Sequence, residues 1–150
     1  MKHLFENHDL ATTGPGEFID VTGDVLSAVE RSGVANGQAL VYTPHTTCTV
    51  LIQERESGYY DDARALLDRL APCEGTYYRH DDLDVRTEGL EDDDLHPNGW
   101  SHLRASLFGS ASQTIPIVEG KLLLGPWQKV FFCELDRPRS RKVFIQITGE

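Results

Sequence analysis

The last third of the chain consists of apolar runs separated only by short polar turns, and this pattern limits the fold more than any other feature. Residues 114–118 and 121–124 flank a Glu-Gly dipeptide suited to a two-residue hairpin turn. Two more runs, rich in β-branched and aromatic residues, follow at 129–135 and 142–148. Because these strands succeed one another instead of alternating with helices, we expect an α+β fold with a mostly antiparallel sheet.

Two or three helices are expected in the first two thirds of the chain. Thr22 offers an N-cap for a first helix, which Gly33 ends. A second helix at residues 61–71 has an apolar face and stops at Pro72, and a short third helix is expected at 102–108. Three further strands are expected in apolar runs at residues 17–21, 39–42 and 48–52.

The length and the apolar content indicate one packed domain, residues 1–150. A hydrophobic share of 39% favours a core over disorder. No apolar run approaches the ~20 residues of a membrane span. The first residues also lack the apolar stretch of a signal peptide. We therefore expect a cytoplasmic protein.

The net charge of −10 argues against two classes of partner. Binding to nucleic acid or to anionic lipid needs clustered Lys and Arg, so neither nucleic acid nor a membrane is expected. One acidic stretch lies at residues 88–94, where we expect a solvated loop, with a salt-adapted surface or a metal-binding loop as open alternatives. This stretch belongs to a long polar segment, residues 73–98, and segments of that length are usually functional or disordered.

The three cysteines form no CxxC pair and no zinc-finger spacing. Cys48 and Cys133 lie inside apolar runs and are expected to be small core residues. Cys73 follows Pro72 at a helix end, and we expect it to be inert. A catalytic cysteine remains an alternative, because pairing with a distant histidine is invisible in a sequence.

Three of the six histidines lie where predicted elements break. His45 sits between two apolar strands, His80 in the long polar segment, and His102 at the start of the third helix. Such junctions aim polar side chains into a cleft from a rigid scaffold, so we expect a polar site built on these residues. His3 and His8 lie in an N-terminal arm and are expected to be exposed and idle.

Neutral imidazoles are good ligands for zinc or a similar divalent ion, and Glu54, Asp81 or Asp82 could orient them. However, no short ligand motif such as HExxH is present. Spacing alone therefore leaves two interpretations open. One is a three-histidine metal site, and the other is three unrelated histidines hydrogen-bonded to the backbone.

A second unusual segment is Gly125-Pro126-Trp127-Gln128, which places two large side chains after a tight turn. Trp127 is either part of the core or the wall of a pocket. In the second case Gln128 would be a hydrogen-bonding group beside a ligand.

Several segments together resemble one known family. They are His45-Thr46-Thr47, Glu54, a helix containing Asp61-Asp62, Tyr78-Arg79-His80-Asp81, residues 98–106, Phe108-Gly109, Ile115-Pro116-Ile117, Gly120 and residues 124–128. In this order, over nearly the whole chain, they resemble the YjbQ-like family, also labelled secondary thiamine-phosphate synthase-like. One segment departs from it: relatives often carry Asn-Glu-Asn-Cys-Asp-Pro where this chain has residues 53–58, so no role of that cysteine transfers.

The resemblance implies a compact α+β fold and a homotrimer. It also implies that His45, His80 and His102 cluster in a pocket that binds a divalent metal, with zinc as the first choice and magnesium as the alternative. Finally, it implies a weak thiamine-phosphate synthase activity.

Two functions are compatible with these features. The first is a metal-assisted enzyme acting on a small phosphorylated molecule, with Glu54 as base and His45 and His102 as further catalytic residues. Its substrate-binding residues would be Thr46, Arg104, Ser106, Trp127 and Gln128. The alternative is a non-catalytic, trimeric protein that binds a small anion or metabolite in the same pocket. A purely structural role for the histidines is a third interpretation.

Overall fold

The computed structural model describes residues 1–91 and 95–150. Within them the helices are α1 (Thr22–Ser32), α2 (Ser57–Leu70) and α3 (Gly99–Phe108), with a 3₁₀ turn, η1, at Arg79–Asp81. The strands are β1 (Lys2–Ala11), β2 (Glu17–Asp20), β3 (Gly37–Tyr42), β4 (Cys48–Glu54), β5 (Ser112–Val118), β6 (Lys121–Leu122), β7 (Gln128–Glu134) and β8 (Ser140–Gly149). Of the predicted acidic loop, residues 92–94 lie outside the described residues, whereas Glu88 and Glu91 are exposed.

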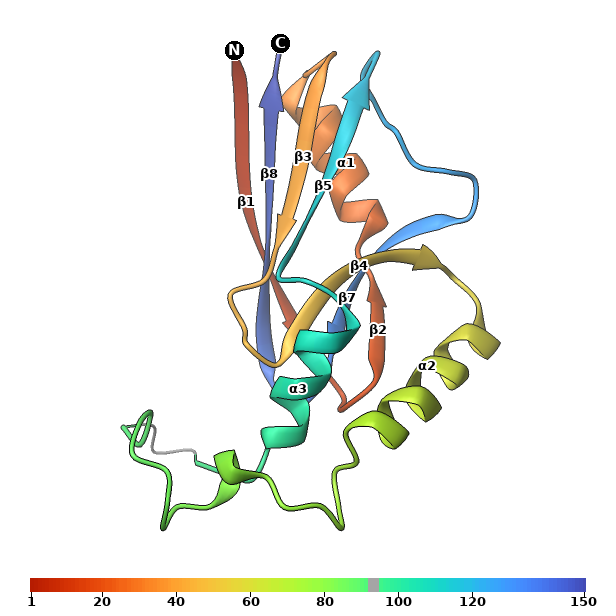
Figure 1. The fold of residues 1–150 in the computed structure, drawn as a ribbon. Coiled ribbons are helices and arrows are strands. Elements are labelled where there is room, and N and C mark those ends of the chain that lie inside the picture. Colours follow the sequence, from red (N-terminus) through yellow and green to blue (C-terminus); the bar gives the residue numbers. More distant parts are fainter. Residues whose placement is uncertain (92–94) are drawn as a thin grey trace.

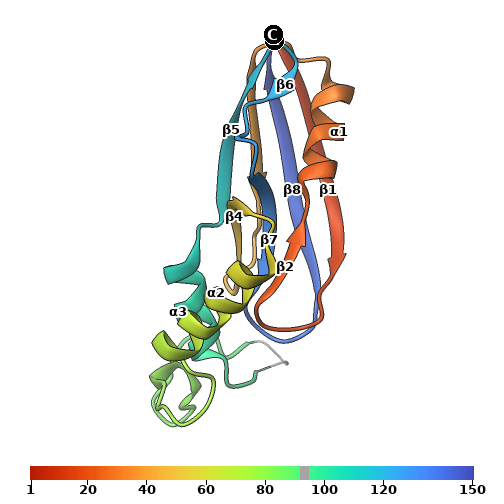
Figure 2. The ribbon, with the colours of Figure 1, turned by 90° about the vertical axis from the view of Figure 1, so that its right-hand side faces the viewer.

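The strands of the described chain form two antiparallel sheets (Figure 1). The larger sheet has the order β1-β8-β3-β5-β6, and the smaller has the order β2-β7-β4. Figures 1 and 2 show α1 against the larger sheet, with α2 and α3 toward the opposite end of the molecule beside the smaller sheet. Helices and antiparallel sheets together confirm the predicted α+β fold.

The main core lies between α1 and the inner faces of the sheets. Side chains point alternately to the two faces of a strand, so every second residue of β3, β5 and β8 faces inward. The fully enclosed apolar side chains of this core include Val25, Ala28, Val41, Val50, Ile115, Ile117, Phe132, Val143, Ile145 and Ile147.

The N-terminal segment is a strand and not the arm expected from the sequence. β1 pairs with β8 along its whole length, from Lys2 opposite Gly149 to Ala11 opposite Ser140. Four consecutive polar residues, Glu6-Asn7-His8-Asp9, interrupt the alternation of apolar and polar residues that would have indicated a strand. One of them, His8, is half-buried and interacts with the Glu6 carboxylate at 3.1 Å, so it is less exposed than expected.

Two helices begin earlier than the sequence pattern indicated. α2 begins at Ser57 because the Glu56 carboxylate accepts the backbone N–H groups of Gly58 and Tyr59, each at 2.7 Å. Carboxylates stabilise helix starts in this way by satisfying N–H groups that lack a partner within the helix. α3 begins at Gly99, whose backbone N–H donates to the carboxylate of Asp81, a residue distant in the sequence.

The cysteines are arranged as expected. Cys48 and Cys133 are buried, whereas Cys73 is exposed, and all three are free thiols. Burial, and then the charge of Glu134, raises the pKa of Cys48 to about 12. A thiol with so high a pKa carries almost no thiolate near neutral pH, which argues against a nucleophilic role. Among the described helices, none is long and apolar enough to cross a membrane.

Candidate functional site

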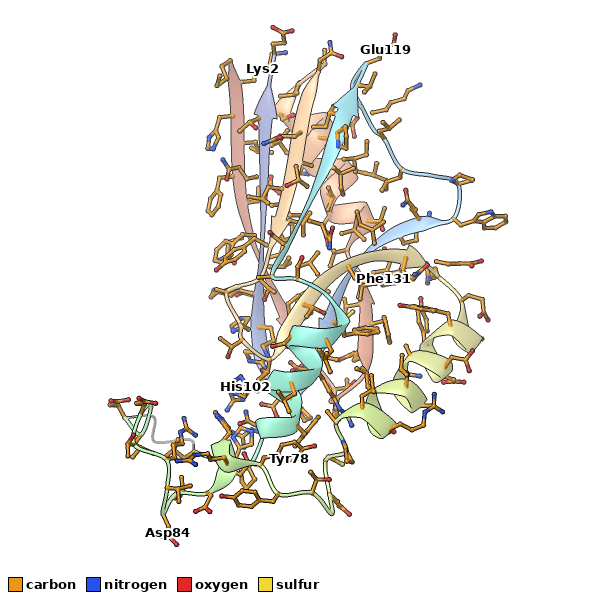
Figure 3. All side chains as sticks on the ribbon, in the orientation of Figure 1. Lys2, Tyr78, Asp84, His102, Glu119 and Phe131 are labelled. Carbon is orange, nitrogen blue, oxygen red and sulfur yellow. The ribbon has the colours of Figure 1, made fainter. Side chains whose placement is uncertain are left out.

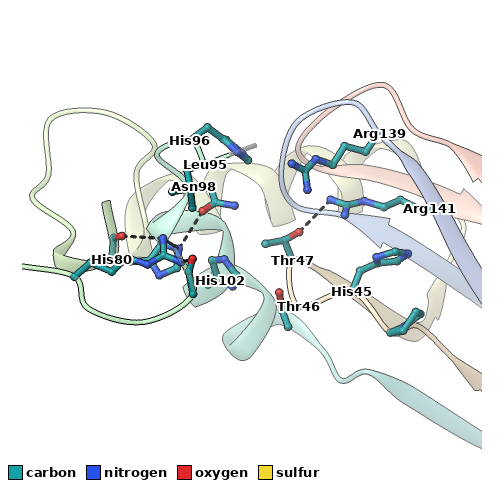
Figure 4. Close-up of a pocket in the computed structure, with 13 residues that line it drawn as sticks. His45, Thr46, Thr47, His80, Leu95, His96, Asn98, His102, Arg139 and Arg141 are labelled. Atoms are coloured by element: carbon teal, nitrogen blue, oxygen red, sulfur yellow. Dashed lines mark hydrogen bonds between the residues drawn. The ribbon is translucent and has the colours of Figure 1, made fainter. Parts of the chain in front are cut away.

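A polar pocket with a cavity of about 300 Å³ opens at the end of the smaller sheet where β4 begins and β7 ends (Figure 4). Three parts of the chain form it: the loop before β4, the turn between β7 and β8, and the polar segment that leads into α3. The residues that line it are Pro44, His45, Thr46, Thr47, His80, Arg86, Gly89, Leu95, His96, Asn98, His102, Arg139 and Arg141.

The pocket contains all three predicted histidines, but they lie on two different walls. The rings of His80 and His102 lie side by side, with centroids 4.5 Å apart. Figure 4 shows His45 on the opposite wall, beside the strand that carries Arg141. There the His45 Nε2 accepts the backbone N–H of Lys142 at 2.9 Å. This bond leaves the remaining ring hydrogen of a neutral His45 on Nδ1.

The pocket environment disfavours the charged form of two of these histidines. Burial is the largest cause for both, and it lowers the pKa of His45 and of His102. The Arg141 charge adds to the effect at His45, and His80 adds to it at His102. Both imidazoles are therefore neutral at neutral pH. In the described part of the chain, the His102 ring has no hydrogen-bond partner, so its nitrogens are available to a ligand.

A buried ion pair holds the floor of the pocket. Glu134, at the end of β7, is fully buried, and Arg141 on β8 is 4% exposed. The Arg141 Nε and Nη2 donate to the two Glu134 oxygens at 2.6 and 2.8 Å, a fork-like pairing. The same Nη2 also donates to the Thr47 hydroxyl at 3.0 Å. The pair therefore ties the predicted His45-Thr46-Thr47 segment to the sheet.

The long polar segment is attached to the pocket through the start of α3. The Asp81 carboxylate accepts the backbone N–H groups of Asn98 and Gly99, at 2.9 and 2.8 Å. Figure 3 shows Tyr78, which leads into this turn, beneath the end of α3 that carries His102. This cap explains why His80 and His102, far apart in the sequence, meet. It also gives Asp81 a role other than the predicted orientation of a metal ligand.

The family comparison agrees with this architecture. The model of the UPF0047 protein YjbQ-like family matches residues 6–150. The chain belongs to the YjbQ-like family. A relative from Methanothermobacter thermautotrophicus is 36% identical over 94% of this chain and 89% of its own length. A relative from Archaeoglobus fulgidus is 39% identical over 91% of this chain and 95% of its own length.

Solved YjbQ-like structures share the fold over nearly the full length. A YbjQ-like protein of unknown function from Sulfolobus solfataricus superposes with a TM-score of 0.83 at 30% identity, covering 99% of both chains. An uncharacterized conserved protein of the family from Clostridium acetobutylicum gives a TM-score of 0.78 at 36% identity, covering 95% of this chain and 99% of the other.

Within this YjbQ-like chain, three of the predicted site residues lie far from the histidines. Glu54 and Gln128 are opposite each other at the far end of the smaller sheet, and Trp127 is exposed next to them. β4 leads from the His45 loop to Glu54 over six residue steps, which is about 20 Å. The structure thus brings these three together as a second group, separate from the pocket.

Two further predicted substrate-binding residues point away from the pocket. Arg104 is buried and donates to the Ala71 carbonyl at 2.8 Å and to Asp68 at 2.7 Å, so it fastens α3 to α2. The exposed Ser106 donates to the His102 carbonyl at 3.0 Å along its own helix. Thr46, in contrast, lines the pocket as expected.

Sequence reasoning missed several residues in or beside the pocket, which are Arg86, His96, Asn98, Asp136, Arg139 and Arg141. The turn from Asp136 to Ser140 carries alternating arginines after a buried strand, a pattern that by itself indicates only a connection between strands. His96 lies in a segment without periodicity. Its role depends on Asp136, a partner forty positions away.

The predicted three-histidine metal set is not assembled in the described part of the chain. There, no three side chains of His, Cys, Asp or Glu are close enough to hold a metal ion. His80 and His102 could supply two imidazoles, whereas the His45 Nε2 lone pair is used by Lys142. Of the three predicted ligands, the described residues therefore bring only His80 and His102 side by side.

Proposed function

We propose that this protein binds a small phosphorylated molecule in the pocket. One observation carries the proposal: a chain of net charge −10 gathers three arginines and four histidines around one cavity, and no carboxylate is among the described lining residues. Concentrated positive charge in a polar cleft attracts anions and orients their oxygens.

Arg141 is a pre-oriented donor in this pocket. Glu134 and Thr47 occupy its Nε and Nη2, whereas its Nη1 has no hydrogen-bond partner in the described part of the chain. Because the side chain is 4% exposed and lines the cavity, this nitrogen is held in place before any ligand arrives. A pre-oriented guanidinium loses little entropy when it binds an oxyanion. Arg139 adds a second guanidinium to the same wall (Figure 4).

The cavity size favours a small ligand. At about 300 Å³ it lies at the lower end of the usual range for small-molecule pockets, roughly 300–1,000 Å³. The Thr46 hydroxyl and the imidazoles of His80 and His102 complete a lining that suits a phosphate or a diphosphate with a small organic group.

Calorimetric titration with pyrophosphate and with glycerol phosphate tests the proposal. Arg139→Gln should weaken binding about tenfold or more, since a hydrogen bond to a charged group contributes roughly 1.5–3 kcal/mol. Arg55→Gln is the matched control, because it removes the same charge from the far end of β4 and should leave binding unchanged. Absence of binding, or equal affinity for both variants, would refute the proposal.

Catalysis on the bound molecule is the second candidate. It is favoured by His102, a neutral imidazole beside His80 that can accept a proton from a reacting group. In the thiamine-phosphate version, a pyrimidine diphosphate joins a thiazole phosphate and releases pyrophosphate, so both reactants carry the phosphate that the pocket suits. His102→Ala should then abolish rescue of cells that lack the usual synthase. A ligand that raises the melting temperature and is recovered unchanged would instead favour binding alone.

We propose separately that the pocket binds a divalent metal ion. Its support is limited to the adjacent imidazoles of His80 and His102, to which a bound phosphate could add oxygen ligands. Metal analysis of the purified protein tests it, with zinc expected before magnesium. Loss of the metal in His80→Ala would support this pair as ligands, and loss in His45→Ala would instead support the full three-histidine set.

We further propose that the protein is a homotrimer, as the resemblance implied. The support is an apolar area on the outer face of the larger sheet, formed by Phe5, Leu40, Tyr42 and Phe144. Its rings stack, with Phe144 centroids 5.6 Å from Phe5 and 6.2 Å from Tyr42. Light scattering should give the trimer mass for the natural protein and a lower mass for Phe5→Ser. Leu70→Ser, which removes a similarly exposed apolar side chain from α2, should keep the trimer.

A further inference from the structure

A buried carboxylate that the proposed function does not use lies behind the pocket. Asp136, just after β7, is 1% exposed. Its two oxygens lie 3.2 Å from the His96 Nε2, and Oδ2 also accepts the Asn98 Nδ2 at 3.2 Å. One carboxylate therefore contacts two residues that line the cavity, both from the segment leading into α3.

Asp136 is ionised at neutral pH. Burial alone would raise the pKa of Asp136, but the hydrogen bonds from Asn98, His96 and the Arg137 backbone outweigh it and bring the pKa below its ordinary value. An ionised carboxylate only accepts hydrogen bonds. The His96 Nε2 must therefore carry a hydrogen, so Nδ1 is the nitrogen without one in a neutral ring.

The same argument extends through Asn98 to His80. Because the Asn98 Nδ2 donates to Asp136, its Oδ1 is the atom that lies 3.2 Å from the His80 Nε2. An amide oxygen accepts and does not donate, so the His80 Nε2 must carry a hydrogen as well. The reverse amide orientation would place Oδ1 against the Asp136 anion. Arg86 Nη1 also lies 3.4 Å from the same ring nitrogen; with the hydrogen on Nε2, the hydrogen bond that this group makes to His80 is the one to its carbonyl, at 3.3 Å.

We propose that Asp136 is the positioning residue of the pocket, fixing the Nε2-protonated form of His96 directly and of His80 through Asn98. In the neutral form, the nitrogen without a hydrogen is then Nδ1 in both rings. His45, on the opposite wall, has the other form, because its Nε2 accepts the Lys142 backbone N–H. This assignment does not rest on the proposed function, since the hydrogen positions are set without a ligand.

Long-range ¹H–¹⁵N NMR of the imidazoles tests this assignment, because it distinguishes a protonated ring nitrogen from an unprotonated one. In the ligand-free protein, above neutral pH, His96 and His80 should show Nε2–H and His45 should show Nδ1–H. Asp136→Asn should abolish the single-form pattern at His96 and His80, because an amide both donates and accepts. The His45 pattern should stay unchanged and serves as an internal control.

Two further variants separate this role from simple support of the fold. Asn98→Ala removes the link to His80 and leaves the His96 contact with Asp136, so only His80 should lose its single form. The Asn98 side chain makes no hydrogen bond to the helix backbone, so this change removes no cap. Asp84→Asn, an exposed carboxylate of the same segment, should alter neither ring (Figure 3).

An Nδ1–H form for His96 or His80 in the natural protein would overturn the proposal, even if Asp136→Asn does not fold. Unchanged patterns in a folded Asp136→Asn would overturn it too. These spectra need no ligand, so a failure of phosphate binding is observed separately, in the calorimetric titration. If the hydrogen assignment and phosphate binding are both confirmed, adding saturating pyrophosphate should shift the Nδ1 signals of the natural protein and leave the Nε2 bonds in place.

Discussion

Replacing Glu134 by Gln should be among the most destabilising conservative changes in this protein. The substitution keeps the size of a fully buried side chain but removes the charge that Arg141 faces at 2.6 and 2.8 Å. Breaking a buried ion pair by removing one partner typically costs about 3–5 kcal/mol, because the other charge stays buried without compensation. Glu134 also accepts the Thr12 hydroxyl and the Asp136 backbone N–H, each at 2.9 Å. The side-chain amide of Gln has one acceptor oxygen in place of two, so it can accept from only some of these donors.

Urea unfolding measures this cost. A loss of about 3–5 kcal/mol is a large share of the roughly 5–15 kcal/mol that holds a typical domain folded, so the midpoint should fall steeply while the slope stays constant. A second change, Arg141→Met, should cost much less in the Glu134→Gln background than alone, because there it removes an unpaired charge, whereas alone it leaves the Glu134 charge without a partner. Pyrophosphate should also stabilise Glu134→Gln more than the natural protein, since the anion replaces the missing counter-charge.

A loss below about 1 kcal/mol for Glu134→Gln would refute the reasoning, because it would place the pair among ion pairs that water screens. Additive effects of the two changes would refute it as well. Either result would mean that Arg141 is not held by Glu134, and its role as a pre-oriented donor would fall with it.

Three more predictions concern titration, reactivity and packing. Burial lowers the pKa of His45 and His102 in the folded protein, so the unfolded chain binds protons more readily. The unfolding free energy should therefore be highest above about pH 6.5, the ordinary histidine pKa, and should fall as the pH drops from there through the lower folded-state pKa values; His102→Gln should flatten this fall. Alkylation at mild pH should label Cys73 alone in the folded protein and all three thiols after denaturation. Gly99→Ala should lower the melting temperature, because the added Cβ would lie 2.8 Å from the Tyr78 Cβ, a distance at which two carbon atoms clash unless the chain shifts.

The fold was largely predictable where strands are apolar and short turns separate them. The C-terminal strands and the ends of α1 and α2, at Gly33 and before Pro72, follow from local pattern. β1 was missed because its partner, β8, lies at the other end of the chain and stabilises a segment whose central residues are all polar. Pairing of that kind has no local signal.

The site was predictable in part. His45, His80 and His102 do line one pocket, because each sits at a break between elements, and such breaks gather at the end of a sheet. Glu54 and Trp127 were expected beside these histidines, but the length of β4 separates the two groups. The order of motifs along the sequence does not indicate such a distance. The arginines and the Asp136 contacts depend on partners that meet only in three dimensions.

A crystal structure of the protein with pyrophosphate tests the central claim most directly. The account predicts an anion in the pocket with an oxygen within hydrogen-bond distance of the Arg141 Nη1 and with Arg139 beside it. An empty pocket at a pyrophosphate concentration that saturates binding in solution, or an anion bound at another surface, would contradict it.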